Sequence, residues 1–586
     1  MQKQFPHSPE PGNSITAAVM LSLAPASSAA LSNSNAEYDY IIVGAGSAGC
    51  VLANRLTADG QNKVLLVEAG GEDRSWKFHM PAALMYTLTN PKYNWCYYTE
   101  PQKHMNNRKM YWPRGKVLGG CSSHNAMVYM RGHAYDYDRW EKEGAAGWSY
   151  ADVLPYFKRS QTHEYGEDEY RGGDGPLHVS RGHGTNPLYP AFLEAGQQAG
   201  YPFTDDINGF QQEGFGYFDM TIKDGKRCST SVGYLRPAMS RSNLTVKTKV
   251  MVNQVMFEGR RAVGIEMEHK GRVQEVRAAK EVVLSAGAIN TPQLLMLSGV
   301  GDADSLRGLD IPLRTHLPGV GANLQDHLEI YIQYKCTKPI TLYSYQWKFP
   351  INMVRTGVEW FLTNKGPAST AHLEVGAFFR SRAGLEHPDI QLHFLPSVII
   401  DHGQKTGDCH AFQAHAGPLR STSVGTVKLK NKDPRQWPLL DPNYMSTQSD
   451  IEEFRANVRL TREIFAQKAF DEFRAEELAP TSQIQSDKEI DAFVRSQADT
   501  AYHCSCSCKM GDESDPLAVV DSQCRVFGLD GLRVVDASIM PSAVSGNLNG
   551  PTVMMAEKAS DMILGNKSLP KLDAPVYRPK SIDTQR

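Results

Sequence analysis

Residues 38–56 combine an apolar run, a glycine-rich turn and a helical pattern. The run from Tyr38 to Val43 is short and mostly apolar, which is typical of a buried strand. After the turn, apolar residues recur with helical spacing as far as Leu56. The pattern therefore predicts a strand, a tight turn and a helix. The turn consists of Gly44, Ala45, Gly46, Ser47, Ala48 and Gly49.

A second apolar run, from Val64 to Val67, ends in Glu68, 24 positions after Gly44. The glycines of a G-x-G-x-x-G turn let a pyrophosphate approach the backbone and let helix pack on strand, while the helix N-terminus stabilises the phosphate charge. An acid at this spacing reaches a ribose hydroxyl, which suits FAD or NAD rather than NADP. We therefore predict a dinucleotide site in preference to an ordinary glycine-containing turn. Its expected contacts are Gly44, Gly46, Ser47, Ala48, Gly49 and Glu68.

Composition places the chain among globular enzymes. Its 586 residues are enough for two or more domains. Because 62 Lys and Arg stand against 64 Asp and Glu, the formal net charge is -2, and no basic footprint marks a nucleic-acid partner. Hydrophobic residues at 41% and charged residues at 22% argue against a disordered or coiled-coil chain. Ten Cys do not make a disulfide scaffold at this length, so we expect free thiols.

Two segments bear on targeting and membranes. No stretch approaches the roughly 18 apolar residues of a spanning helix, so no spanning anchor is expected. Residues 1–36 are rich in Ser and Ala, with one Lys and no Arg, which leaves a targeting peptide and a disordered tail both open. The segment from Trp347 to Leu362 mixes large apolar side chains with Lys348 and Arg355. We expect a helix that packs over a pocket rather than a membrane-docking surface.

Further glycine-rich motifs follow along the chain. The stretch PRGKVLGGCSSHNAMVYMR contains the Gly119–Gly120 pair, which suits a backbone packed closely on a flat ligand. GAINTPQLLMLSGVG begins at Gly287, and GLDGLRVVDASIMP ends at 541. With the N-terminal turn, these motifs resemble the glucose-methanol-choline (GMC) flavoprotein oxidoreductases from about residue 38 to about residue 566. Cys121 and His124 depart from the pattern that most members share at those two positions.

The resemblance implies an α/β plus α+β fold. A Rossmann-like FAD-binding domain of the GMC type is expected beside a substrate-binding domain with an antiparallel sheet. The FAD-binding domain should be discontinuous, over residues 37–185, 225–330 and 515–566; residues 186–224 and 331–514 should bind substrate, and residues 567–586 should form a tail. FAD is the implied cofactor. Further implied cofactor contacts are Gly119, Gly120, His124, Asn125, Val252, Asp536 and Ala537.

Oxidation of an alcohol by hydride transfer to a flavin needs a base that removes the hydroxyl proton. Any one of the 18 His is more often structural than catalytic, but His503 precedes the KMG stretch, where GMC enzymes carry their catalytic His. The resemblance implies His503 as base or alkoxide-stabilising donor. It implies Asn549 as the catalytic hydrogen-bonding partner of His503. A loop-capping amide is the alternative for Asn549, a role that Asn547 could also fill.

Several stretches, such as GANLQDHLEIYIQ, are most similar to the choline-oxidising members of the family. Choline carries a permanent cation with no hydrogen to donate, so a carboxylate and aromatic faces must hold it. Glu329 matches the carboxylate of those relatives; an exposed acid at a strand start is the alternative. Tyr502, beside His503, is the aromatic candidate, and Trp95 and Phe394 are weaker ones. His393 aligns with a His that binds the alcohol oxygen.

Two unusual features remain open in the sequence. Choline oxidases share the GCSSHN motif and attach FAD covalently through its His, so an 8α-histidyl bond is our hypothesis for His124; a buried His packed over the flavin edge is the alternative. Cys504, Cys506 and Cys508 alternate, but no second Cys/His cluster completes a metal site. We expect three small buried side chains on one face of a strand, and no metal.

The leading interpretation is FAD-dependent oxidation of choline to betaine aldehyde, the first step of glycine betaine synthesis. One alternative keeps the family but changes the alcohol or the oxidant, as in a choline oxidase that uses oxygen. A second is a flavin-binding interaction protein without turnover. A quinone or respiratory-chain electron acceptor and association with the mitochondrial inner membrane follow from the resemblance only.

Overall fold

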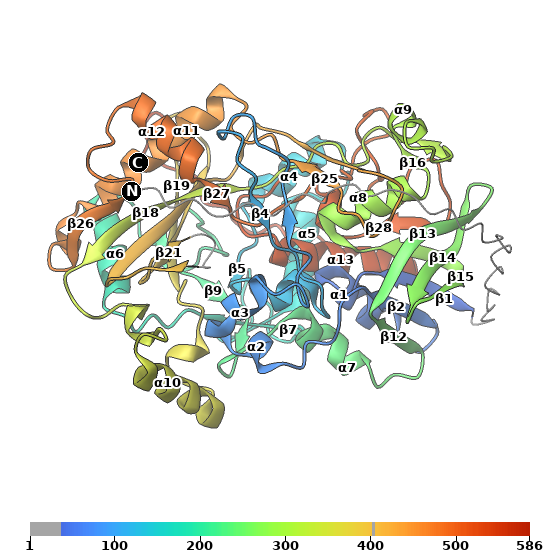
Figure 1. Cartoon of the computed structure of the whole chain (residues 1–586), viewed down its shortest axis with the longest axis horizontal. Coiled ribbons are helices and arrows are strands. Elements are labelled where there is room, and N and C mark those ends of the chain that lie inside the picture. The colour runs from blue at the N-terminus through green and yellow to red at the C-terminus, as the bar shows by residue number, and fades with distance from the viewer. Residues whose placement is uncertain (1–36, 401–404) are drawn as a thin grey trace, which may run out of the picture.

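The computed structural model describes residues 37–400 and 405–586. The targeting or tail segment expected for residues 1–36 lies outside these ranges. Two large sheets lie side by side, a mainly parallel one on the right of Figure 1 and an antiparallel one on the left. This arrangement confirms the predicted fold class.

The mainly parallel sheet contains the strands that the two apolar runs predicted. Its order is β12-β2-β1-β15-β14-β13, and β28 pairs with β15. The first four strands and β28 pair in parallel, whereas β13, β14 and β15 form an antiparallel meander. Strands covered on both faces need nearly continuous apolar runs, which β1 and β2 have. The bounds are β1 (Tyr38–Val43), β2 (Val64–Glu68), β12 (Leu244–Thr248), β13 (Val250–Glu258), β14 (Arg261–His269), β15 (Arg272–Leu284) and β28 (Leu532–Val534).

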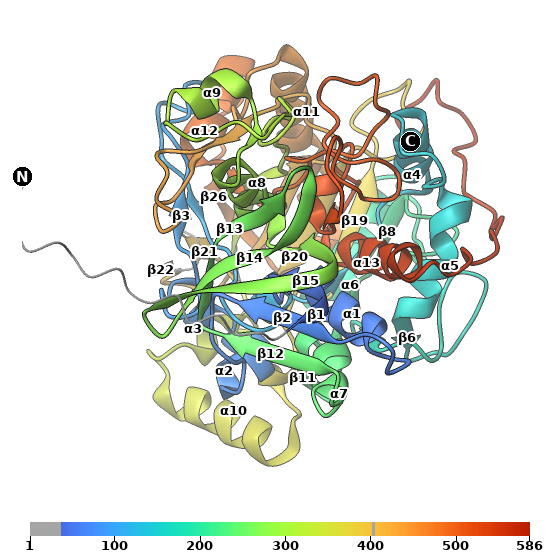
Figure 2. The ribbon, with the colours of Figure 1, turned by 90° about the vertical axis from the view of Figure 1, so that its right-hand side faces the viewer.

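Helices from distant parts of the chain cover this sheet. The helix predicted after the glycine turn is α1 (Ser47–Leu56), which packs against α13 (Asn549–Leu564). In turn, α13 packs against α5 (Tyr150–Ser160). Figure 2 views the sheet with these three helices to one side. The start of α1 and the start of α13 therefore both reach the edge of the sheet where β1 ends.

The second sheet is antiparallel throughout, in the order β26-β18-β23-β20-β19-β8, with β27 on β18. Its apolar face forms a core with α6 and α11. Because β8 comes from the 186–224 segment and β18 begins inside the 225–330 segment, the bounds of the two domains stay a prediction. The elements are β8 (Gly214–Tyr217), β18 (Leu328–Cys336), β19 (Val375–Phe379), β20 (Ile390–Leu395), β23 (Ala411–Pro418), β26 (Arg474–Ala479), β27 (Asp499–Thr500), α6 (Leu188–Gln198) and α11 (Gln448–Phe465).

Small sheets and short helices complete the described part of the chain. Four strands pair in the order β5-β9-β7-β6, and β3-β4, β10-β11, β16-β17, β21-β22 and β24-β25 form pairs. These strands are β3 (Tyr97–Tyr98), β4 (Tyr111–Trp112), β5 (Val128–Tyr129), β6 (Gln161–His163), β7 (Leu177–Arg181), β9 (Asp219–Met220), β10 (Ile222–Lys223), β11 (Lys226–Arg227), β16 (Val300–Gly301), β17 (Thr315–His316), β21 (Ile399–Ile400), β22 (Lys405–Thr406), β24 (Thr426–Lys428) and β25 (Leu439–Asp441). The remaining α-helices are α2 (Trp76–His79), α3 (Met85–Leu88), α4 (Ala134–Lys142), α7 (Arg236–Ala238), α8 (Gly287–Leu297), α9 (Ala303–Arg307), α10 (Pro350–Thr363) and α12 (Asp487–Gln497). Over the two described ranges, the helices are too short or too polar to cross a membrane.

Candidate active site

A cavity of about 900 Å³ is lined by residues of both large sheets. At one end, the turn between β1 and α1 leaves room that only glycine permits. A Cβ on Gly49 would lie 1.9 Å from the carbonyl oxygen of Gly44, and Gly44 has a φ of +101°. Gly46 precedes α1 without any side-chain cap. The first N–H groups of α1 are thus available to an anion, as in dinucleotide-binding turns.

Glu68 holds the shape of this turn. Its two carboxylate oxygens accept hydrogen bonds from the backbone N–H groups of Ala45, at 2.9 Å, and Gly70, at 2.8 Å. Burial raises the pKa of Glu68 to about 7, although the hydrogen bonds from the two N–H groups act to lower it. Ser47, in the first turn of α1, donates a hydrogen bond from Oγ to Asn549 Oδ1 at 2.7 Å. The glycine turn and the start of α13 are therefore tied together.

The other predicted glycine-rich motifs form the adjoining walls. A Cβ on Gly120 would lie 2.8 Å from the Cα of Gly46, so the Gly119–Gly120 pair packs directly on the first turn. Asp536 Oδ2 accepts hydrogen bonds from the Gly287 N–H, at 2.9 Å, and the Thr291 hydroxyl, at 2.6 Å. The structure thus brings these motifs together at one site. Val252, Asp536 and Ala537 also line the cavity.

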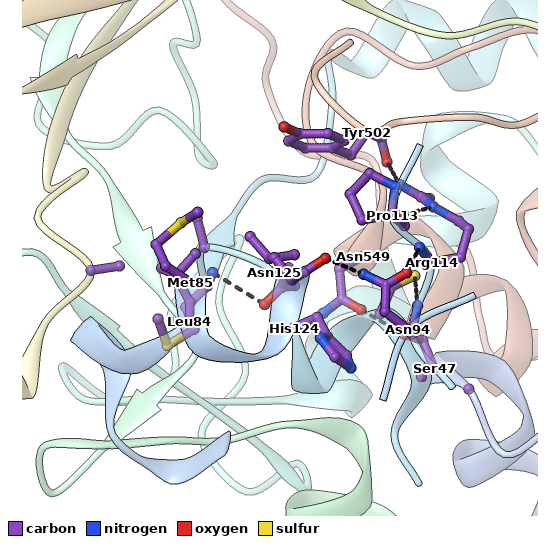
Figure 3. A pocket seen from close by; sticks show the side chains of 18 of the residues that line it. Ser47, Leu84, Met85, Asn94, Pro113, Arg114, His124, Asn125, Tyr502 and Asn549 are labelled. Carbon is purple, nitrogen blue, oxygen red and sulfur yellow. Dashed lines mark hydrogen bonds between the residues drawn. The ribbon is translucent and has the colours of Figure 1, made fainter. Parts of the chain in front are cut away.

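His124 and Asn125 lie in the same wall, as Figure 3 shows. His124 is buried, and neither ring nitrogen has a hydrogen-bond partner among the described residues. Burial, with a contribution from the Arg227 guanidinium, lowers the pKa of His124 to about 3. Arg227 donates to the side-chain oxygen of Asn125 at 2.7 Å. A buried imidazole with a lowered pKa therefore lies in this wall, with Phe78 edge-on to it at 5.6 Å between centroids.

His503 lies where two chains of hydrogen bonds meet. The Leu419 carbonyl oxygen, which only accepts, is 2.9 Å from His327 Nε2, so His327 carries its proton there. Its Nδ1 then accepts from His503 Nδ1 at 3.0 Å. Burial lowers the pKa of both imidazoles, to about 4 for His327 and well below the ordinary value for His503. His503 is therefore neutral with its proton on Nδ1, and its Nε2 carries a lone pair that accepts from Asn547 Nδ2 at 3.1 Å.

Asp326 holds the backbone of His503. Its Oδ1 accepts a hydrogen bond from the His503 N–H at 2.7 Å. The other oxygen accepts from the hydroxyls of Thr500 and Tyr444. Burial raises the pKa of Asp326 to about 6. Asp326, Thr500 and Tyr444 lie far apart in the sequence, and their hydrogen bonds together hold the backbone of His503.

The cavity face of the antiparallel sheet carries a row of polar side chains. Tyr331 of β18 pairs with His415 of β23, which pairs with His393 of β20. His415 Nδ1 lies 2.9 Å from Glu329 Oε1, and Glu329 is buried. His393 Nε2 lies 3.4 Å from Asn547 Oδ1, which joins this row to His503. Alternation along each strand directs these side chains away from the apolar core.

One backbone group fixes the protonation of His415. Gln413 Oε1 accepts from the Ile399 N–H at 3.0 Å, so the Nε2 end of that amide faces His415. Gln413 Nε2 then donates to His415 Nε2 at 2.6 Å. His415 keeps its proton on Nδ1 and donates it to Glu329. In this arrangement Nε2 of His415 accepts a hydrogen bond and Nδ1 donates one to Glu329.

Comparison with known proteins decides the family. Profiles of the GMC oxidoreductase family match residues 38–329 and 421–556. The chain belongs to this family. It is 60% identical over 562 residues to a mitochondrial choline dehydrogenase of Homo sapiens, covering 95% of this chain and 94% of the relative.

Other GMC relatives cover nearly the whole chain as well. An oxygen-dependent choline dehydrogenase of Photobacterium profundum is 51% identical over 554 residues, covering 94% of this chain and 97% of the relative. The crystal structure of pyridoxine 4-oxidase from Mesorbium loti superposes with a TM-score of 0.82 at 31% identity, over 90% of this chain and 99% of that one. The family resemblance predicted from the motifs is confirmed.

The structure corrects one assignment made from the GMC pattern. That pattern predicts a hydrogen bond from Asn549 to His503, but the side-chain oxygen of Asn549 accepts from Ser47 instead. Asn547, two residues earlier, provides the amide beside His503. The two asparagines lie together where α13 begins, and the residue spacing alone does not distinguish them. The predicted partner is therefore wrong, and Asn549 belongs to the glycine turn.

The aromatic candidates differ in where they lie. Tyr502 lines the cavity, and its carbonyl oxygen accepts from Arg114 at 2.7 Å. Trp95 also lines it, but the Lys116 ammonium lies 4.5 Å from its ring centroid, so one cation is already present there. Phe394 is wrong as a candidate, because it is fully buried in the core on the opposite side of β20 from His393. Tyr331, which the sequence did not single out, lines the cavity beside His415.

The alternating cysteines do not share one strand face. Cys504 packs in the core behind the antiparallel sheet, whereas Cys506 and Cys508 pack in the core of the parallel sheet. Burial raises the pKa of Cys504 to about 12. All ten cysteines are free, as expected. Within residues 37–400 and 405–586, no cluster of three or more His, Cys, Asp or Glu is arranged to hold a metal.

Sequence reasoning missed three further side chains of the site, besides Asn547 and Tyr331. His327, Gln413 and His415 were not singled out, although they fix the protonation of His503 and of the Glu329 partner. A signal existed for two of them, because Gln413 and His415 are alternate polar positions in an otherwise apolar strand. His327 carried no such signal.

Proposed function

We propose that this protein is an FAD-dependent choline dehydrogenase that oxidises choline to betaine aldehyde. The observation that carries the proposal is the lone pair on His503 Nε2, held at a cavity that also contains the buried Glu329 carboxylate and the dinucleotide turn. Both curated relatives described above are named as choline dehydrogenases.

FAD fits the residues at the dinucleotide end. A pyrophosphate suits this end for two reasons. Gly44 and Gly49 leave space that side chains would fill, and the start of α1 is uncapped. Glu68, Asp536 and the Gly119–Gly120 pair complete the cradle. When bound, FAD supplies the hydride acceptor. His124, neutral and unpartnered in the same wall, is the side chain that we assign to an 8α-histidyl bond with the cofactor.

His503 acts as the base. The substrate hydroxyl competes with the Asn547 amide for the lone pair on Nε2 and gives its proton to that atom. The proton already on Nδ1 stays in its bond to His327, because the Leu419 carbonyl oxygen fixes the protonation of His327. Asn547, His393 and the imidazolium formed at His503 then surround the alcohol oxygen as negative charge develops on it.

Glu329 holds the quaternary ammonium group. A trimethylammonium cation offers no hydrogen-bond donor, so a buried carboxylate and aromatic faces are the groups that recognise it. The neutral His415 leaves the charge of Glu329 uncompensated until the substrate arrives. Tyr331 and Tyr502 are the nearby aromatic lining residues that we assign to this site.

The experiment compares Glu329→Gln with the wild type on choline and on 3,3-dimethyl-1-butanol, in which carbon replaces the cationic nitrogen. Loss of the charge interaction should raise KM for choline by about tenfold to hundredfold, because two opposite charges about 4 Å apart attract by up to about 4 kcal/mol at an effective dielectric constant of about 20. The neutral alcohol should be little affected. Glu476→Gln, at an exposed ion pair with Lys335, is the control. Equal losses on both alcohols would refute the role of Glu329.

The electron acceptor and the location are the finer parts of the proposal. We assign a quinone of the respiratory chain as acceptor and a mitochondrial location at the inner membrane, in line with the mitochondrial relative. An oxygen-using enzyme is the second candidate, favoured by the name of the bacterial relative. Rates of anaerobic turnover with a water-soluble quinone against rates with oxygen alone distinguish the two. Absence of flavin bleaching with choline would favour a binding protein without turnover.

A further inference from the structure

Helix α10 carries an apolar stripe whose side chains are largely exposed. Ile351 is 82% exposed and Leu362 is 80% exposed, and Val354, Val358 and Phe361 are each more than half exposed. Their spacing of three, four and seven residues places all five on one face of the helix. Trp360 lies on the opposite face and is buried, where its Nε1 donates to the Gly225 carbonyl oxygen at 2.8 Å. The helix is therefore attached by one face and apolar on the other.

Aromatic side chains from other segments continue the stripe. Trp76 packs edge-on against Phe361, with centroids 5.6 Å apart, and against Tyr86, at 6.1 Å. Trp347 donates from Nε1 to the Tyr86 hydroxyl at 3.1 Å. Figure 1 shows α10 projecting from the body at the lower left. We refer to the following residues as the α10 face: Trp76, Tyr86, Trp347, Ile351, Val354, Val358, Phe361 and Leu362.

The chemistry around the α10 face selects a lipid surface as its occupant. Lys348, Arg355 and Lys365 are exposed along this segment, and Glu359 is the one acid on the helix itself. Trp and Tyr beside an apolar stripe, with cations nearby, are the composition of helices that lie in a membrane interface. A twofold dimer through the same face would bring these cations close to their copies.

We infer that the α10 face docks the protein onto an anionic lipid bilayer, with α10 lying in the plane of the interface. Val354, Val358 and Phe361 of the stripe line the active-site cavity, as do Met353, Thr356 and Gly357 of the same helix. Docking therefore sets the lipid surface at a part of the cavity wall whose side chains are also exposed. The segment forms a helix that lines the cavity, as expected from the sequence. Docking is a second role for this helix, and it does not depend on which alcohol is oxidised.

The main test is flotation of the full-length holoenzyme with vesicles of phosphatidylcholine alone or with added phosphatidylglycerol. Ile351→Asn/Leu362→Asn should lower the vesicle-bound to free ratio by roughly tenfold or more, because two exposed aliphatic side chains lose their contact with lipid. Val273→Asn/Leu313→Asn is the matched control, since those aliphatic side chains are 42% and 48% exposed in the other half of the molecule. Melting temperatures should match the wild type for both pairs.

Two further measurements separate the lipid from other occupants. Lys348→Gln/Arg355→Gln/Lys365→Gln should abolish the preference for anionic vesicles. Tryptophan quenching by brominated lipid should fall in Trp347→Phe but not in Trp437→Phe, whose ring is 44% exposed beside Tyr97. Flotation of the Ile351→Asn/Leu362→Asn variant at the wild-type level would overturn the inference. So would sedimentation that shows a dimer lost in that variant without any binding to vesicles.

These variants also separate docking from catalysis. Choline oxidation with a water-soluble acceptor should stay within twofold of the wild type in Ile351→Asn/Leu362→Asn. A loss of vesicle binding with normal choline turnover supports the docking role. Failure of choline turnover in the wild type itself would refute the proposed activity and leave the flotation result unaffected.

Discussion

The dinucleotide end and the alcohol end of the cavity are built in different ways. At the dinucleotide end, one continuous segment forms β1, the glycine turn, α1 and β2, and Glu68 closes that turn by bonds to residues within 23 positions. At the alcohol end, neighbouring side chains come from β18, β20, β23 and two loops. Glu329 and His415, in contact there, are 86 positions apart. The first site is a local motif, whereas the second exists only after the sheet has formed.

The difference explains where reasoning from sequence failed. Spacing within a segment constrains a turn, because backbone geometry relates the residues directly. Across strands, register decides which side chains meet, and a shift of one residue would exchange the polar and apolar faces. Asn547 and Asn549 lie at the boundary between the two ends of the cavity. Asn549 bonds to Ser47 at the dinucleotide end, and Asn547 bonds to His503 at the alcohol end. Substitutions at the two ends should therefore affect different properties, and the largest effect is expected at the base.

The strongest change within the alcohol end is His503→Ala. Loss of the base should lower the rate of anaerobic flavin reduction by choline about a hundredfold to ten-thousandfold. Bound flavin should stay at the wild-type level, because the dinucleotide turn is separate. Stopped-flow absorbance gives both values, and His183→Gln, with a side chain 70% exposed, is the control. Reduction within tenfold of the wild-type rate would contradict the assignment.

At the dinucleotide end, Gly49→Ala should abolish flavin binding. The added Cβ would lie 1.9 Å from the Gly44 carbonyl oxygen, so the turn must move. We expect flavin occupancy to fall by more than tenfold, with folded protein recovered at lower yield, since such overpacking costs about 1–3 kcal/mol. Gly71→Ala is the matched control, because nothing lies within 4 Å of its Cβ position. Equal flavin content in the two variants would show that the turn tolerates a side chain.

The two asparagines test the boundary directly. Asn547→Ala should slow flavin reduction by about tenfold, the loss expected for one hydrogen bond at a reacting group, with flavin content unchanged. Asn549→Ala should instead weaken flavin binding, because Ser47 loses its acceptor. Titration of each apoprotein with FAD, followed by rapid kinetics, measures both effects. If Asn549→Ala alone slowed reduction, the original assignment from the family pattern would be restored.

The smallest expected effect is on stability against pH. Burial lowers the pKa of His327 and of His393 to about 4. The unfolded chain binds these protons near pH 6.5 and the folded chain does not, so stability present above that pH should be lost as pH falls toward 4. The contribution of Glu68 to stability depends on pH in the opposite direction. Because its pKa is raised, it stabilises the fold below about pH 4.5, and that contribution is lost as pH rises toward 7.

Denaturant unfolding between pH 4 and pH 7 measures these contributions. His393→Gln should flatten the acid-side loss by about 1–3 kcal/mol, because a shift from about 6.5 to about 4 exceeds one pKa unit and each unit corresponds to about 1.4 kcal/mol. Glu68→Gln should leave the acid-side loss in place and remove part of the loss toward pH 7. His183→Gln again serves as control, because its side chain is 70% exposed. An unchanged curve for His393→Gln would contradict a neutral buried imidazole at that position.

Prediction from sequence reached the fold class, the family and the cofactor, and it named His503 and the glycine motifs, which the structure places around one cavity. The parallel strands and α1 followed from apolar runs, because a strand buried on both faces leaves little choice of residue. It did not reach Asn547, His327 or His415, which contribute only through partners brought close by folding. The helix expected over the pocket is α10, which lines the cavity, but the sequence did not show how far its large apolar side chains are exposed.

The sequence by itself determined the glycine turn, its acid and the motifs that pack on them, because short-range backbone geometry requires those residues at those spacings. Only the tertiary structure decided which amide and which imidazoles surround His503, because register and loop placement bring residues together across hundreds of positions. It also decided which face of α10 the protein leaves uncovered. Burial then set the neutral state of these imidazoles, since a charge without water or a partner is unfavourable.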